Sequence, residues 1–97
     1  MSEQKLQTKI LKWLDKQGFY TIKVIVCNKK GVTDIIACSP QGRFVGIEVK
    51  WGNNKPSKLQ EYHVSEIKKR NGFAMVCWSL ESLKNELKKE GLYVSFY

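Results

Sequence analysis

Residues 34–50 read DIIACSPQGRFVGIEVK. Two apolar runs rich in β-branched side chains, 34–38 and 43–50, flank the residues SPQG at 39–42, whose composition is typical of a turn. This arrangement predicts an antiparallel hairpin. With the turn centred on Gln41, the opposing pairs are Cys38 with Phe44, Ile36 with Gly46, and Asp34 with Glu48.

Alternation along the second strand separates polar from apolar side chains. Residues two apart share a face of a strand, so Glu48 and Lys50 point the same way. Ile47 and Val49 then face the core. The small Gly46 leaves space beside the polar face for a phosphate or a backbone to approach.

The predicted register brings two carboxylates together. Opposing residues of an antiparallel pair have Cβ atoms about 4.5–5.5 Å apart, so Asp34 and Glu48 would repel each other unless a cation lies between them. Such hard oxygen ligands suit Mg²⁺ or Mn²⁺. We therefore expect a divalent metal site, with Lys50 placed to stabilise charge on a phosphate or to orient and activate an attacking water.

Each of these residues also has a purely structural interpretation. Glu48 and Lys50 could belong to an ordinary cross-strand ion pair, and Asp34 could be a turn residue that follows Gly31. The register that joins Asp34 to Glu48 is what favours the metal site over these alternatives.

Working outward from the hairpin, caps and apolar periodicity predict the remaining elements. Before the hairpin come a helix capped by Ser2 and ended by Gly18 and a strand from Tyr20 to Val26. After it come a helix capped by Ser57 and closed by Asn71 and Gly72, and a strand from Phe73 to Trp78. The chain then has a helix capped by Ser79 and ended by Gly91, and a strand from Leu92 to Tyr97. The order αβββαβαβ predicts an α/β fold with a mixed sheet, and 97 residues leave room for a single domain over 1–97.

The charge balance points to a polyanionic partner. Seventeen Lys and Arg against nine Asp and Glu give a net charge of +8, which favours nucleic acid before membrane, although a solvated basic surface is the alternative. No apolar run approaches a membrane span, and the first residues have no signal-peptide core, so we expect a cytoplasmic protein.

Cysteine and histidine usage excludes several metal chemistries. Cys27, Cys38 and Cys77 lie far apart in apolar runs, and we expect reduced core residues. With His63 as the single histidine, a zinc site or a nuclease built on paired histidines is excluded.

Two further polar residues are placed where they have ordinary structural uses. Glu3 lies in the first turn of a helix, where a carboxylate suits the helix dipole, and Gln60 has capping-box spacing from Ser57. Taken singly, both are better explained by these uses than by catalysis.

Together, several short motifs resemble those of the VRR-NUC family in the PD-(D/E)xK nuclease superfamily. They are Glu3, the run GVTD at 31–34, the run GIEVK at 46–50 and the run SKLQ at 57–60. The resemblance spans about residues 3 to 80 and implies a restriction-endonuclease-like fold with the core order αβββαβ, to which this chain adds a helix and a strand. Thr33 stands where the family often has proline, and we expect the geometry to survive because Thr is compatible with a strand.

The resemblance also implies roles for individual residues. Asp34 and Glu48 would bind the metal, with the Val49 carbonyl as a further ligand, and Lys50 would be catalytic. Glu3 and Gln60 would support the active site, Glu3 through a metal-bound water.

The function implied in this way is a metal-dependent, structure-selective DNA endonuclease, with four-way (Holliday) junctions as a candidate substrate. A homodimer would suit two strand cuts, and the run LYVSFY at 92–97 offers an aromatic edge strand for it. The alternative is a non-catalytic basic nucleic-acid-binding module on the same fold. A plain interaction domain would leave the charge of +8 unexplained.

Overall fold

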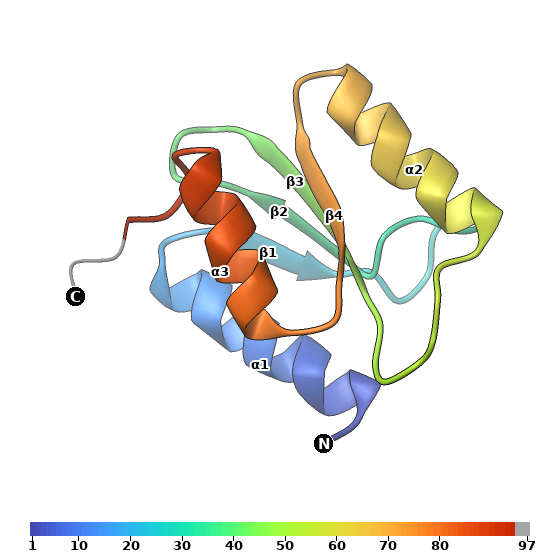
Figure 1. The fold of residues 1–97 in the computed structure, drawn as a ribbon. Helices are drawn as coiled ribbons and strands as arrows, with labels where there is room; N and C mark the ends of the chain where they lie inside the picture. The colour runs from blue at the N-terminus through green and yellow to red at the C-terminus, as the bar shows by residue number, and fades with distance from the viewer. Residues whose placement is uncertain (95–97) are drawn as a thin grey trace.

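A computed structural model describes residues 1–94 and shows one mixed sheet between two layers of helix (Figure 1). The elements are α1 (Glu3–Lys16), β1 (Tyr20–Lys23), β2 (Ile35–Cys38), β3 (Phe44–Val49), α2 (Lys58–Lys69), β4 (Phe73–Cys77) and α3 (Leu80–Lys89). The strands lie in the order β1-β2-β3-β4. Strand β2 is antiparallel to both β1 and β3, and β4 runs parallel to β3 after a crossover through α2.

The hairpin has the register predicted from its turn. Ile36 pairs with Gly46 and Cys38 with Phe44. Ser39 donates its backbone N–H to the carbonyl of Arg43 at 2.9 Å and accepts the N–H of Arg43 on its hydroxyl at 3.0 Å, which closes the turn. This register places the whole of β3 relative to β2.

One face of the sheet packs against α1 and α3. Ser2 caps α1, accepting the N–H of Lys5 on its hydroxyl. The apolar stripes of α1 and α3 are buried against alternate residues of β2, β3 and β4. The helix residues are Leu6, Ile10, Leu14, Leu83 and Leu87, and the strand residues are Ile35, Val45, Ile47, Val49 and Cys77. Ile47 and Val49 thus face the core, as predicted.

The other face packs against α2, which begins with the predicted capping box. Ser57 accepts the N–H of Gln60 at 3.1 Å, and the Gln60 side chain accepts the N–H of Ser57 at 2.9 Å. Gly46 lies under this helix, because a Cβ there would lie 2.5 Å from Cδ1 of Ile67. The expectation that Gly46 leaves room for a phosphate is therefore wrong: the space is filled by α2.

Two predicted strands need correction. Strand β1 ends at Lys23, so the predicted strand through Val26 is too long. Leu92–Val94 form no strand. Leu92 is buried, and the ring of Tyr93 packs edge-on against Trp13 at 4.8 Å, so both serve the monomer's own core. The rest of the predicted final strand, 95–97, lies outside the described residues.

The cysteines are free, but only one of them is a core residue. Cys77 is buried, and burial raises the pKa of its thiol. Cys27 and Cys38 are exposed, so the prediction of three core cysteines is wrong for these two. Cys27 lies in the loop after β1, and Cys38 lies at the end of β2 with its side chain outward. Over residues 1–94, no helix is long and apolar enough to cross a membrane.

Candidate active site

Asp34 lies at the end of the sheet, one residue before β2. Its Oδ2 accepts the backbone N–H of Val49 at 2.8 Å. Its own carbonyl accepts the N–H of Val24 at 2.9 Å, so the residue is fixed from both neighbouring strands. Thr33 is buried, and its hydroxyl donates to the carbonyl of Ile35 at 3.2 Å. The threonine is thus buried directly before Asp34 and bonded across it to Ile35.

Glu48 is buried on the α2 face of the central strand β3. Its side chain is 1% exposed, and its Oε1 has no hydrogen-bond partner among residues 1–94. Burial in the protein and the nearby carboxyl of Asp34 raise the pKa of Glu48 to about 7, while Lys50 opposes the rise. A carboxylate that is buried and lacks hydrogen-bond partners lowers the free energy of unfolding when it is charged.

Lys50 shares the face of Glu48, as the alternation predicts. Its Nζ lies 3.4 Å from Oε2 of Glu48, and its side chain is largely buried at 14% exposure. The backbone N–H of Lys50 donates to the carbonyl of Cys77 at 2.9 Å, which ties the end of β3 to β4. The site thus holds two carboxylates and one ammonium group at one end of the sheet.

This donor set fits a divalent cation. Two hard oxygen ligands lie close enough to raise the pKa of Glu48, and one buried carboxylate oxygen has no partner among residues 1–94. Within the same residues, however, no group of three or more Asp, Glu, His and Cys side chains could hold a metal ion. A further protein ligand would therefore come from a backbone, amide or hydroxyl oxygen, and the carbonyl of Val49 remains the predicted one.

The two supporting residues predicted for the site are placed differently from the central three. Glu3 lies in the first turn of α1, where it is half-buried, and it is not gathered with Asp34 and Glu48 into a three-carboxylate cluster. Gln60 uses its side-chain oxygen in the capping box of α2. The structure thus shows the capping use of Gln60, and the active-site roles of Glu3 and Gln60 stay predictions.

Aromatic side chains stand beside the site at the ends of the two parallel strands. Trp51 follows Lys50 directly and is 38% exposed. Trp78 follows β4, and its Nε1 donates to the carbonyl of Asn54 at 2.9 Å, which holds the loop after β3. Nothing in the sequence pattern indicates the bond between Trp78 and Asn54, because both residues lie between elements.

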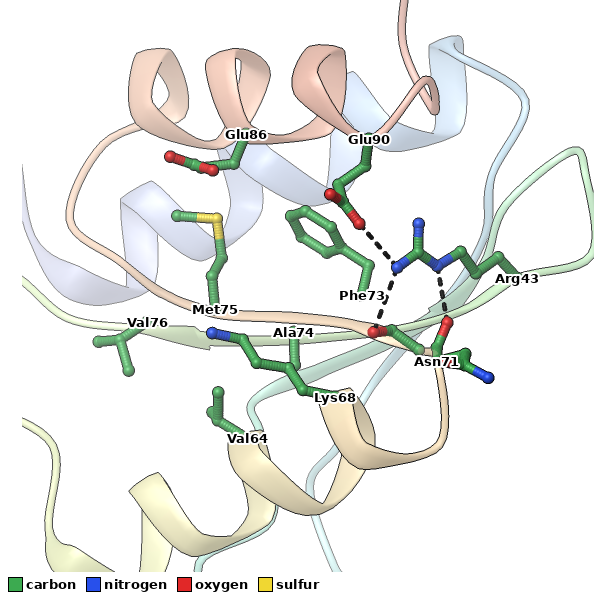
Figure 2. A pocket seen from close by; sticks show the side chains of 11 residues that line it. Arg43, Val64, Lys68, Asn71, Phe73, Ala74, Met75, Val76, Glu86 and Glu90 are labelled. Carbon is green, nitrogen blue, oxygen red and sulfur yellow. Dashed lines mark hydrogen bonds and ion pairs between the residues drawn. The ribbon is translucent and has the colours of Figure 1, made fainter.

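A cavity of about 650 Å³ lies away from these residues, between α2 and α3 on the β4 side (Figure 2). Arg43 spans one end of it, donating to Glu90 at 2.7 Å and to the carbonyl of Asn71 at 2.9 Å. Figure 2 shows Lys68 from α2 and Glu86 from α3 on opposite sides. Because its lining includes none of the three central residues, this cavity is separate from the candidate site.

Comparison with known proteins identifies the fold. No protein-family model and no curated protein matches the sequence. One solved structure, described as a "VRR_NUC domain", is similar with a TM-score of 0.74 and 22% sequence identity, over 98% of this chain and 97% of that chain. The chain therefore has the fold of a VRR_NUC domain over nearly its whole length, which confirms the fold that the sequence motifs imply.

Proposed function

We propose that this protein is a divalent-metal-dependent endonuclease that hydrolyses phosphodiester bonds in DNA. The observation that carries the proposal is the buried carboxylate of Glu48, which lies beside Asp34 and Lys50 with one oxygen unpartnered among residues 1–94. An arrangement that costs stability without a ligand is typical of a functional site. The similarity in fold to a VRR_NUC domain supports a nuclease.

Asp34 and Glu48 would hold Mg²⁺ or Mn²⁺, with the Val49 carbonyl as a further ligand. A bound divalent ion would act as a Lewis acid toward a phosphoryl oxygen and lower the pKa of a water molecule. Asp34 is already oriented for this role by the N–H of Val49, and Glu48 is held in the most buried strand. Both ligands therefore need little rearrangement on binding.

Lys50 would act on the reacting phosphate. Its backbone is fixed at the end of β3 by the bond to Cys77, and its ammonium group lies beside Glu48 rather than free in solvent. A fixed positive charge in a poorly solvated position stabilises negative charge that develops in a transition state. The same group can donate a hydrogen bond to an attacking water.

We propose branched DNA as the substrate, with the four-way junction as the candidate, and a homodimer as the working form. The net charge of +8 supplies affinity for the phosphate backbone. Two copies would bring two sites to a nearly two-fold symmetric junction. Light scattering tests the dimer: we expect about twice 11.2 kDa, and a mass near 11.2 kDa together with full junction cleavage would contradict it.

A non-catalytic nucleic-acid-binding module is the second candidate. One observation favours it: the described residues gather two carboxylates and no third His, Cys, Asp or Glu. A binding module, however, would gain nothing from carboxylates placed beside phosphates.

Cleavage assays separate the two candidates. Labelled duplex, flap and four-way junction are incubated with Mg²⁺, Mn²⁺ or EDTA, and binding is measured in Ca²⁺. We expect cleavage by the wild type in Mg²⁺ or Mn²⁺ only. Asp34→Asn and Glu48→Gln should bind DNA but not cut it, while the matched control Glu81→Gln, an exposed carboxylate on α3, should cut normally. Cleavage in EDTA, or undiminished cleavage by Asp34→Asn, would overturn the assignment.

A further inference from the structure

The loop between β1 and β2 exposes two adjacent apolar side chains. Ile25 is 83% exposed and Val26 is 90% exposed, and Val24 separates them from the end of the short strand β1. Single apolar residues on a surface are common, but two adjacent branched residues exposed to this degree indicate a contact surface.

This loop starts at the candidate active site. Val24 donates its N–H to the carbonyl of Asp34, which extends the ladder one pair beyond Lys23 and Ile35. Opposing Cα atoms in such a ladder are about 5 Å apart, and successive ones about 3.8 Å, so the Cα of Ile25 lies within about 9 Å of that of Asp34. Nucleotides on one DNA strand are spaced by about 3.4 Å along the axis. The apolar pair is therefore within about three nucleotides of a phosphate bound at Asp34.

The second arm of the loop, which leads into β2, contacts α2. Figure 1 shows this arm at the end of the sheet where α2 begins. His63 Nε2 bonds the carbonyl of Lys30 at 2.9 Å. Gly31, with φ of 77°, packs so tightly that a Cβ would lie 2.6 Å from Cγ of Leu59. Both arms are anchored, so the exposed pair is presented on a supported loop.

Exposed lysines flank the apolar pair on both sides. Lys23 precedes it, and Lys29 and Lys30 follow it. This pattern complements DNA. Its phosphates are anionic and would contact the lysines, and its stacked bases are planar and apolar and would contact the apolar pair. An apolar protein surface alone would match the pair but not the lysines.

Resting on the proposed function, we propose that residues 23–30 are a DNA wedge, in which Ile25 and Val26 insert between bases beside the scissile phosphate. The flanking lysines hold the phosphates on either side. Inserting an apolar side chain requires two bases to unstack, and this costs least where stacking is already interrupted. The wedge thus directs the nuclease toward branch points and away from intact duplex.

The test reads base unstacking directly. A four-way junction carries 2-aminopurine, a base whose fluorescence rises when it unstacks, next to the branch, and Ca²⁺ replaces Mg²⁺ to prevent cleavage. The variants are Ile25→Ser/Val26→Ser, which removes the apolar pair, and Lys29→Ala/Lys30→Ala, which removes charge. The control is Tyr20→Ser, a change of a 71% exposed side chain at the opposite end of β1.

We expect the wild type and Tyr20→Ser to raise the fluorescence, and Ile25→Ser/Val26→Ser to lose the rise and bind the junction about tenfold more weakly, with duplex binding unchanged. Lys29→Ala/Lys30→Ala should weaken binding to both substrates but restore the rise at saturating protein. An equal rise with Ile25→Ser/Val26→Ser would overturn the wedge. The wedge would also be overturned if the dimer dissociates in Ile25→Ser/Val26→Ser while the fluorescence rise persists. That result would show that the apolar pair forms a contact between two copies of the protein.

Failure of the wedge and failure of the nuclease are distinguishable. If the wild type unstacks the junction but never cleaves it in Mg²⁺ or Mn²⁺, the nuclease assignment falls and the wedge stands. If cleavage is normal and no unstacking occurs, the wedge falls alone. Absence of any DNA binding would overturn both.

Discussion

Replacing Glu48 with glutamine should make the metal-free protein more stable at neutral and higher pH. The change keeps the size and shape of the side chain and removes the charge that burial and Asp34 disfavour. A rise in the pKa of Glu48 from its ordinary value of 4.5 to about 7 corresponds to at most about 3 kcal/mol. This pKa already includes the opposing effect of Lys50, so we expect a gain of about 1 to 3 kcal/mol.

The sign of the pH dependence follows from the same pKa. Between pH 4.5 and about 7, the folded chain retains a proton on Glu48 that the unfolded chain has lost. The free energy of unfolding of the wild type therefore falls as pH rises through this window, relative to the glutamine variant. The two proteins should be similar below about pH 4.5 and differ most at about pH 8.

Urea unfolding in EDTA across this range gives the measurement, with thermal unfolding as a check. For a domain of this size, each kcal/mol shifts Tm by about 4–8 °C.

Saturating Mg²⁺ should raise the Tm of the wild type and leave that of the variant unchanged, because a ligand stabilises only the state that binds it. Glu66→Gln is the control: its carboxylate is ion-paired with Lys69 and Arg70, which lower its pKa, so this change should bring no gain in stability. A wild type as stable as Glu48→Gln at about pH 8 in EDTA would refute the reasoning.

Three further outcomes follow from the structure. Lys50→Ala should lose far more single-turnover rate than affinity for DNA in Ca²⁺, since a fixed charge acts on the transition state; equal losses would make Lys50 a binding residue. Junction binding should weaken with salt at a log-log slope of about −0.9 per phosphate contact, and a slope near zero would exclude the basic surface. Gly46→Ala should destabilise the fold by about 1 kcal/mol in urea unfolding, because its Cβ would crowd Ile67, and Ile67→Val should recover part of that loss; a neutral Gly46→Ala would show that α2 can shift freely.

The hairpin and the helices could be predicted because their signals are local. The turn at 39–42 determines the register of β2 and β3, and the caps at Ser2, Ser57 and Ser79 mark the starts of three helices. Each of these signals depends on residues a few positions apart. The carboxylate pair could be predicted with them, because Asp34 comes directly before β2 and Glu48 follows Ile47, the partner of Ile35 in the same hairpin.

The features that could not be predicted depend on packing between distant segments. Ile25 and Val26 have strand propensity, but β1 has only β2 as a neighbour in the described sheet, and β2 starts at Ile35. The pairing therefore ends one residue past Lys23, and propensity alone cannot show this. In the same way, Leu92 and Tyr93 look like a strand, but Leu92 is buried in the core and Tyr93 packs against Trp13 of α1.

The hydrophobic core and the candidate site depend on one and the same register. A slip of one residue in β3 would turn Ile47 and Val49, both fully buried against α1 and α3, toward α2, and would drive the charge of Glu48 into the apolar core. Burying an uncompensated charge and losing two core side chains each cost several kcal/mol, comparable to the whole stability of a small domain. The core therefore holds Glu48 and Lys50 in place against the repulsion from Asp34. An unfavourable carboxylate pair can persist in so small a protein because separating it would require taking the sheet apart.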